Sequence, residues 1–166
     1  MKALKLLFLF VSAGLLSGCG VYNFTGAKPM SGSFQVNYFQ NNSELVQPGI
    51  ERTFTNKLQD LIQNQTNLTL TNSNGDRVYE GEIVDYRITP MSATADQRAA
   101  ENRLTIAVNV RYTNKKNEEE SQEKRYSFYR DFPGSQQPSN AELTAYIDEI
   151  FDRLTQDIFN DTLAKW

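Results

Sequence analysis

Asn102-Arg103-Leu104-Thr105-Ile106-Ala107-Val108-Asn109-Val110-Arg111-Tyr112-Thr113 is the clearest strand pattern in this chain. Large apolar residues stand at every second position from Leu104 to Tyr112, and smaller or polar residues stand between them. Because successive side chains of a strand point to opposite faces, this alternation predicts a half-buried strand with one apolar face. Its twelve residues exceed the usual strand length of five or six.

Strands are also predicted on both sides of this stretch. A charged turn leads downstream to Gln122–Arg130, which returns with its apolar aromatic residues in phase. A polar loop over residues 91–101 separates the stretch from an upstream strand, Arg77–Pro90. The alternation of that upstream strand is imperfect because Tyr79 is out of phase with its later apolar residues, and Gly81 between them is a candidate bulge.

Two more strands are expected nearer the N-terminus. Asn67–Thr71 is short, and the turn residues 72–76 that follow it include Asn74-Gly75, which tolerates positive φ. We therefore expect Asn67–Thr71 to form a hairpin with Arg77–Pro90. Ser33–Gln40 alternates apolar and polar residues, which predicts a half-buried strand.

Two amphipathic helices complete the pattern. Pro48–Gln63 carries apolar residues at helical spacing, and Pro48 suits a first helical turn. The second helix is expected from Ser139 to about Asp161, and it opens with Ser139-Asn140-Ala141-Glu142, the pattern of a capping box. Each helix has a single apolar stripe, and each strand has at least a partly one-sided pattern.

The order β-α-β-β-β-β-α predicts an α+β fold. One-sided strands and helices with one apolar stripe are best satisfied by a two-layer sandwich. We expect a mostly antiparallel sheet of four to five strands, with the two helices packed on one face.

The N-terminus has the features of a lipoprotein export signal. Residues 1–18 contain a positive start, an apolar segment too short to span a bilayer, and the small residues Ser17 and Gly18 before Cys19. Leu16-Ser17-Gly18-Cys19 resembles a bacterial lipobox, which implies lipid attachment to Cys19. Gly20, where a retained lipoprotein would carry Asp, indicates the outer membrane. We expect a lipidated tether over residues 19–32 and a single domain over residues 33–166.

Composition excludes several classes of function. The sequence has no histidine, and Cys19 is its single cysteine. Common zinc sites, thiol nucleophiles and Ser-His-Asp triads are therefore excluded, and we expect neither an enzyme nor a cofactor or metal site. Without Lys2 and Lys5, 15 basic residues stand against 20 acidic ones, a formal charge of −5. This balance argues against nucleic acid as a partner.

Arginines in the middle of the chain are the candidate ligand-binding residues. Arg98 and Arg103 flank the end of the 91–101 loop, and two guanidinium groups there could hold phosphates, although ordinary surface charge is the alternative. Asp85 and Arg87 share a strand face and could form an ion pair at a site, although an ordinary cross-strand contact is the alternative. The acidic residues of the last helix form either a carboxylate site or, as we favour, a solvated face.

Aromatic residues are the candidate partner contacts. Tyr129 alternates to the polar face of its strand, where it would be exposed. Phe159, Leu163 and Trp166 fall outside the main stripe of the last helix, and they either tuck onto the domain or form a docking patch. Asp161-Thr162-Leu163 resembles a short O-glycosylation sequon, which leaves glycosylation of Thr162 as an open question.

The whole mature chain resembles the lipopolysaccharide-assembly lipoprotein (LptE) family, in its divergent Bacteroidetes-type branch. The segments that carry the resemblance are Ser17–Gly26, Phe54–Leu58, Leu70–Asp76, Asn102–Ile106, Thr113–Lys116, Asp157–Asn160 and Trp166. None of them is diagnostic alone, and the resemblance depends on their order and spacing over the chain. This branch departs strongly from the better-known proteobacterial one, so no lipopolysaccharide-binding residue can be transferred by motif.

The resemblance implies a small sheet with two helices on one side and a non-enzymatic role. It implies an outer-membrane lipoprotein that plugs a large β-barrel translocon (LptD) and helps insert lipopolysaccharide into the outer leaflet. Lipopolysaccharide itself would be a possible second partner. The alternative is another periplasm-facing binding or scaffold lipoprotein. An envelope hydrolase is the least favoured reading, because no convincing nucleophile is present.

Overall fold

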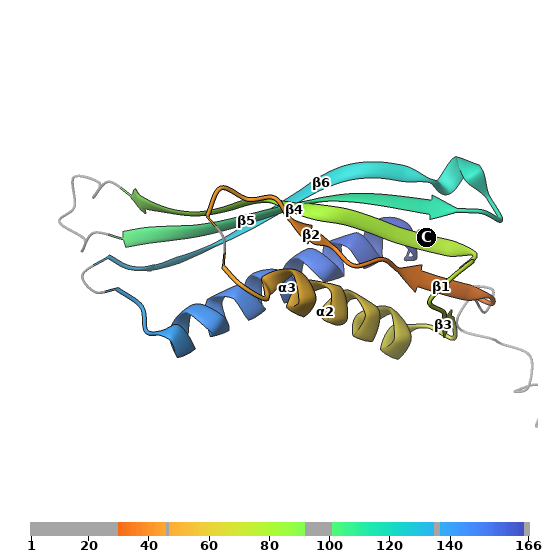
Figure 1. The fold of residues 1–166 in the computed structure, drawn as a ribbon, viewed down its shortest axis with the longest axis horizontal. Coiled ribbons are helices and arrows are strands. Elements are labelled where there is room, and N and C mark those ends of the chain that lie inside the picture. Colours follow the sequence, from red (N-terminus) through yellow and green to blue (C-terminus); the bar gives the residue numbers. More distant parts are fainter. Residues whose placement is uncertain (1–29, 46, 92–100, 135–136, 165–166) are drawn as a thin grey trace, which may run out of the picture.

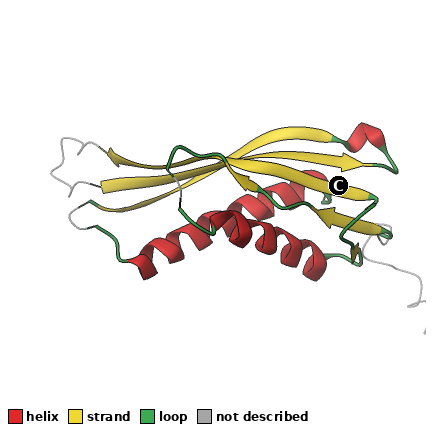
Figure 2. Ribbon diagram, in the orientation of Figure 1, coloured by secondary structure: helices red, strands yellow, loops and turns green. Residues whose placement is uncertain are grey.

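A computed structural model describes residues 30–45, 47–91, 101–134 and 137–164 of the chain. It shows two layers, a sheet and a pair of helices on one of its faces, as expected for an α+β sandwich (Figures 1 and 2). The elements are β1 (Ser33–Val36), β2 (Gln40–Asn41), α2 (Ile50–Gln65), β3 (Thr69–Leu70), β4 (Arg77–Met91), β5 (Glu101–Asn114), the 3₁₀ turn η1 (Glu118–Glu120), β6 (Gln122–Pro133) and α3 (Asn140–Thr162).

The sheet has the order β3-β1-β4-β5-β6, and β2 pairs with β4 beyond the end of β1. The three long strands β4, β5 and β6 are antiparallel, whereas β1 and β2 run parallel to β4 and β3 runs parallel to β1. The expected hairpin between β3 and β4 is therefore wrong, since β1 lies between them. The turn after β3 crosses β1 near its start, where the Ser33 backbone N–H donates to Asp76 Oδ2 over 2.8 Å.

The first predicted strand is interrupted. Val36 pairs with Tyr79 and Gln40 pairs with Glu82. The segment from Val36 to Gln40 therefore contains one more residue than the segment of β4 that it pairs with. The extra residue turns Phe39 into the core, where its ring packs against Phe54 of α2 with 4.9 Å between ring centroids. The break separates β1 from β2.

The bulge of β4 lies at Val84 and not at Gly81, because the register shifts between Ile83 and Asp85. Tyr79 and Ile83 before the shift and Tyr86 after it are all buried. The extra residue thus corrects the phase of the strand, which explains why Tyr79 looks out of phase with the later apolar residues in the sequence.

The predicted central strand is confirmed as β5, which pairs with β4 on one side and β6 on the other. Its apolar residues from Leu104 to Tyr112 are buried against the helices, and Ala107 on the opposite face is buried as well. Figure 1 shows α2 and α3 crossing under this face of the sheet. The rings of Phe54 and Phe151 join the two helices edge to face at 5.1 Å.

Both helices lie close to their predicted positions. The capping box at the start of α3 is present: Ser139 Oγ accepts from the Glu142 backbone N–H, and the Ser139 backbone N–H donates to Glu142 Oε2. Helix α2 begins at Ile50, two residues after Pro48, and its N-cap Gly49 has a φ of 87° with no side-chain cap. The first turn of α2 thus lacks the side-chain capping hydrogen bonds that fix the start of α3.

The end of α3 is buried more fully than an exposed docking patch allows. Phe159 and Leu163 are each 8% exposed and belong to the core, so the alternative in which they tuck onto the domain holds. Helix α3 contacts α2 as well as β5 and β6, which buries more than one stripe of its surface.

Trp166 lies outside the described residues. Thr162 is 4% exposed, so the sequon-like Asp161-Thr162-Leu163 is not accessible in the folded domain.

Candidate functional site

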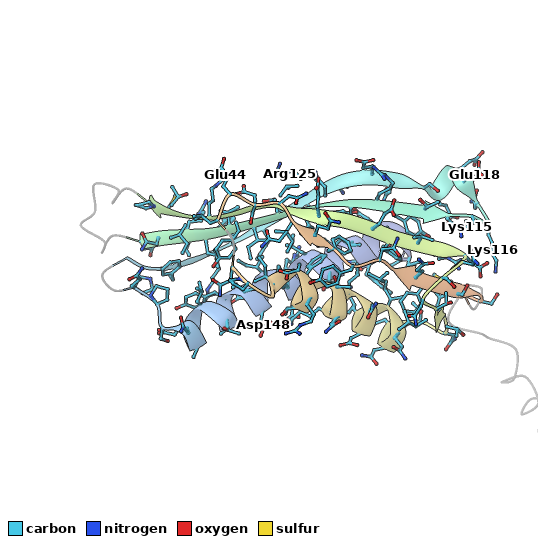
Figure 3. The ribbon with its side chains drawn as sticks, in the orientation of Figure 1. Glu44, Lys115, Lys116, Glu118, Arg125 and Asp148 are labelled. Atoms are coloured by element: carbon cyan, nitrogen blue, oxygen red, sulfur yellow. The ribbon has the colours of Figure 1, made fainter. Side chains whose placement is uncertain are left out.

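The outer face of the sheet, opposite the helices, is the candidate functional surface. Its side chains form rows across β4, β5 and β6, and these rows are Glu80–Arg111–Glu123, Glu82–Asn109–Arg125, Asp85–Ala107–Ser127, Arg87–Thr105–Tyr129 and Thr89–Arg103–Asp131. Figure 3 shows Arg125 and Glu44 on this side of the molecule and Asp148 on the helix side. In the part of the chain that the structure describes, no helix covers this polar face (Figure 1).

Arg103 and Tyr129, which the sequence singles out separately, lie together near the start of β5. The Arg103 guanidinium carbon stands 3.6 Å from the centroid of the Tyr129 ring. Arg103 also binds Asp131 through two hydrogen bonds, from Nε to Oδ1 over 2.7 Å and from Nη2 to Oδ2 over 2.8 Å. Tyr129 is 47% exposed, as predicted from its strand position.

The Asp131 carboxylate changes what Arg103 can bind. The hydrogen bonds between them lower the pKa of Asp131 and raise the pKa of Arg103, so both groups stay charged at neutral pH. The carboxylate occupies the bidentate side of the guanidinium that a phosphate would otherwise use. Arg103 keeps further N–H donors, but the pair is neutral overall. Its predicted partner Arg98 lies outside the described residues.

A second charged cluster lies on the neighbouring rows. Asp85 Oδ2 stands 2.7 Å from Arg87 Nη1 and 3.5 Å from Arg125 Nη2. This confirms the ion pair between Asp85 and Arg87 and adds a third residue. The Asp85 side chain is 14% exposed, whereas both arginines are more than half exposed, so one shielded carboxylate holds two accessible guanidinium groups.

The acidic residues of α3 are paired with basic residues. Lys57 of α2 contacts Asp148 and Asp152, Arg130 contacts Glu149, and Arg153 contacts Asp157. Among the described residues, no group of three or more acidic, histidine or cysteine side chains could hold a metal ion. The structure therefore favours a solvated, ion-paired face over a carboxylate site. None of the described helices is long and apolar enough to cross a bilayer.

Sequence reasoning did not identify Asp131 or Arg125 as parts of these clusters. Arg125 lies within the predicted strand Gln122–Arg130, and Asp131 follows directly after that strand. Only the register of β5 with β6, which pairs Arg103 with Asp131, brings these charges together. Alternation along β6 places Asp131 and Arg125 on the same face as Tyr129, and this was the available signal.

The family model described as LptE, lipopolysaccharide-assembly, matches residues 32–162. No curated protein sequence matches the chain. Rare lipoprotein B from Shewanella oneidensis has a similar structure, with a TM-score of 0.56 at 13% identity over 78% of this chain and 94% of that one.

Two further solved structures share the fold. A hypothetical protein from Chlamydia trachomatis gives a TM-score of 0.56 at 8% identity, covering 82% of this chain and 100% of its own. A protein from Xanthomonas campestris gives 0.53 at 15% identity, covering 84% and 88%. At these identities the likeness concerns the fold.

Proposed function

Because the chain belongs to the LptE lipopolysaccharide-assembly family, we propose that it is the plug and assembly partner of a lipopolysaccharide-translocon β-barrel. In this proposal the protein is anchored to the outer membrane through Cys19, has no enzymatic activity, and helps insert lipopolysaccharide into the outer leaflet. The domain faces the periplasm or the barrel lumen.

The observation that carries this proposal is the polar outer face of the sheet. The rows from Glu80 to Asp131 present charged, amide and hydroxyl side chains over the full length of three strands. A plug must match a barrel interior that is polar and wet, and the mostly polar side chains of this face are compatible with such an interior. The exposed helix face is ion-paired and polar too, so both layers suit an aqueous lumen.

The length of the sheet also supports the proposal. Strand β4 has 15 residues, which at roughly 3.3 Å per residue spans about 50 Å. The start of β1, which follows the tether, lies at one end of the sheet, and the Met91 and Glu101 ends of β4 and β5 lie at the other (Figure 1). A bilayer with its headgroups is about 40–45 Å thick. An upright domain anchored at the periplasmic leaflet would thus reach the outer leaflet.

Arg103 and Tyr129 lie near the Glu101 end of β5, at the end of the sheet opposite β1, and Arg98 precedes this end in the sequence, outside the described residues. We propose that Arg98 and the free donors of Arg103 contact lipopolysaccharide phosphates there, and that Tyr129 contacts the barrel. Asp131 limits the contribution of Arg103, because it occupies two of the guanidinium donors.

The test is affinity capture of the tagged, lipidated protein from detergent-solubilised outer membranes. A large β-barrel protein should be recovered with it in a defined ratio, and depletion of the protein should reduce lipopolysaccharide at the cell surface. Recovery of lipidated protein without a barrel, together with normal surface lipopolysaccharide, would contradict the proposal.

A further inference from the structure

We propose that an acidic groove on the outer face of the sheet docks a basic, lysine- or arginine-bearing segment of the partner barrel. This inference rests on the proposed function, because the partner is the barrel, and it assigns the surface and the charge by which the two proteins recognise each other. The groove lies in the half of the sheet that contains β1 and β2, away from the Arg103 cluster.

The groove is formed where the broken strand β1–β2 meets the three long strands. Its floor is built by β4 and β5 around Glu82 and Asn109, and its walls include Gln40 on one side and Glu123 of β6 on the other. Its volume is about 390 Å³, enough to receive one or two side chains of a partner. The break before β2 leaves room for this hollow at the sheet edge.

Charge in the groove is unbalanced. Arg111 is the one cation among its lining residues, and it is shared between Glu80 and Glu123, at 3.1 Å from each. Glu82 accepts a hydrogen bond only from the neutral amide of Asn42. Three carboxylates against one guanidinium leave a local charge of −2. Nearby Arg125 does not correct this, since it is directed to Asp85.

Two amides in the groove have no partner in the described part of the chain. Neither Gln40 nor Asn109 makes a side-chain hydrogen bond, although neighbouring amides such as Asn37 and Asn42 do. Each free amide offers two donors and an acceptor. They are thus available to bind the backbone of an incoming segment while the carboxylates bind its cation.

The charge selects the class of occupant. A phosphorylated lipid headgroup would be repelled by a groove with two excess negative charges, whereas a basic side chain is attracted to it. A divalent cation is disfavoured because the described carboxylates do not gather in a group of three that could ligate one. The carboxylate and amide groups that line the groove therefore suit a lysine or arginine side chain of another protein.

The experiment combines charge reversal with site-specific crosslinking in the lipidated, full-length protein. Glu82→Lys and Glu123→Lys should each lower the amount of barrel co-purified from outer membranes by about fivefold, the upper range for an exposed ion pair. A photo-crosslinking side chain at Gln40 should form an adduct with a basic segment of the barrel, and higher salt should reduce its yield.

Matched controls come from the exposed face of α2. Asp60→Lys makes the same change in net charge, and Asp60 has no interaction with another described residue, so co-purification should be unchanged. A crosslinker at Asn64 should give less barrel adduct than one at Gln40. Circular dichroism confirms that each variant is folded.

The outcomes separate the two proposals. Equal barrel recovery by Glu82→Lys, Glu123→Lys and the wild type would overturn the groove assignment and leave the plug proposal standing. A Gln40 adduct with lipopolysaccharide and not with the barrel would do the same. Absence of any barrel from the wild-type sample would overturn both.

Discussion

Gly81 occupies a position in β4 that no larger residue can take without movement of its neighbours. A Cβ atom at this position would lie 2.0 Å from the Asn109 carbonyl oxygen of β5 and 2.9 Å from the Phe39 ring. The first of these neighbours is backbone in the middle of the sheet, which cannot give way like a flexible side chain. The glycine is thus required by close approach of strands, not by a bulge.

We therefore expect Gly81→Ala to destabilise the domain by about 2 kcal/mol or more, as overpacking in a rigid interior does. Urea denaturation measures the change. Ser127→Ala, on the exposed face of β6, serves as the control and should stay within about 0.5 kcal/mol of the wild type. A fully stable Gly81→Ala protein would show that the strands can separate at this point.

Asp76 ties the start of the domain to two other parts of the chain. Its carboxylate accepts from the Ser33 backbone N–H over 2.8 Å and lies 2.9 Å from Lys116 Nζ of the turn between β5 and β6. The Ser33 hydrogen bond is the main cause that lowers the pKa of Asp76 from 3.8 to about 2. The charged form of Asp76 is therefore the form that stabilises the fold.

A depressed carboxyl pKa contributes stability above its unfolded value, and that contribution is lost as the pH falls towards the folded value. For Asp76 this window runs from about pH 4 or 5 down to about pH 2. Asp76→Asn should be less stable than the wild type at pH 7, and the two should converge as the pH approaches 2. Denaturation series at several pH values measure this, and a constant difference across the window would contradict the assignment.

At the scale of elements, a buried hydrogen bond joins the end of α3 to strand β4. Tyr79 Oη and Thr162 Oγ1 are 2.9 Å apart, and both residues are buried. Thr162 Oγ1 also donates to the Ile158 carbonyl oxygen over 2.7 Å. Since the threonine hydroxyl has one hydrogen, Tyr79 must be the donor and Thr162 the acceptor.

This direction predicts unequal effects of removing the two partners. Thr162→Val leaves the buried Tyr79 hydroxyl without an acceptor and should cost about 1–3 kcal/mol. Tyr79→Phe leaves Thr162 still bonded to Ile158 and should cost about 1 kcal/mol or less. Introducing Tyr79→Phe into the Thr162→Val protein should recover part of the loss. Equal single-mutant values, with no recovery in the double mutant, would disprove this direction.

Elements whose signals are local could be predicted from the sequence. Strand β5 has its alternation within a single stretch, and the capping box of α3 needs only Ser139 and Glu142, so both were predicted correctly. The hairpin of β3 with β4 failed because a segment from far upstream, β1, competes for the same edge of β4. A turn sequence such as Asn74-Gly75 predicts that the chain changes direction there, but it does not predict which strand the next segment pairs with.

The candidate site shows the same division. Exposure of Tyr129 follows from alternation along one strand, and it was predicted correctly. The bidentate contact of Arg103 with Asp131 depends on the register between two strands, which a single sequence does not specify. Burial of Phe159 and Leu163 depends on α3 packing against a helix and two strands at once, so a single-stripe argument underestimates it.

At the scale of the whole molecule, we propose that the anchor at Cys19 and the fold of the domain are independent of each other. Among the residues that the structure describes, the buried apolar side chains run from Phe34 to Leu163, all of them after Cys19 in the sequence. We propose that lipid attachment at Cys19 decides where the domain is placed and does not contribute to the packing of this core. Stable membrane attachment needs two or more acyl chains. A lipidated N-terminal cysteine would carry that number.

Cys19→Ser should accordingly abolish lipidation and release the protein from the outer membrane, while the two-layer domain keeps its circular dichroism spectrum and urea midpoint. Fatty-acid labelling and membrane fractionation measure the first effect. Loss of the folded signal in Cys19→Ser would contradict the separation of anchor and fold. If the folded, unlipidated protein still partitions with outer membranes, the barrel must retain it, and that retention should then fall when Glu82→Lys is added. Retention unaffected by the added charge would assign the remaining attachment to a surface other than the acidic groove.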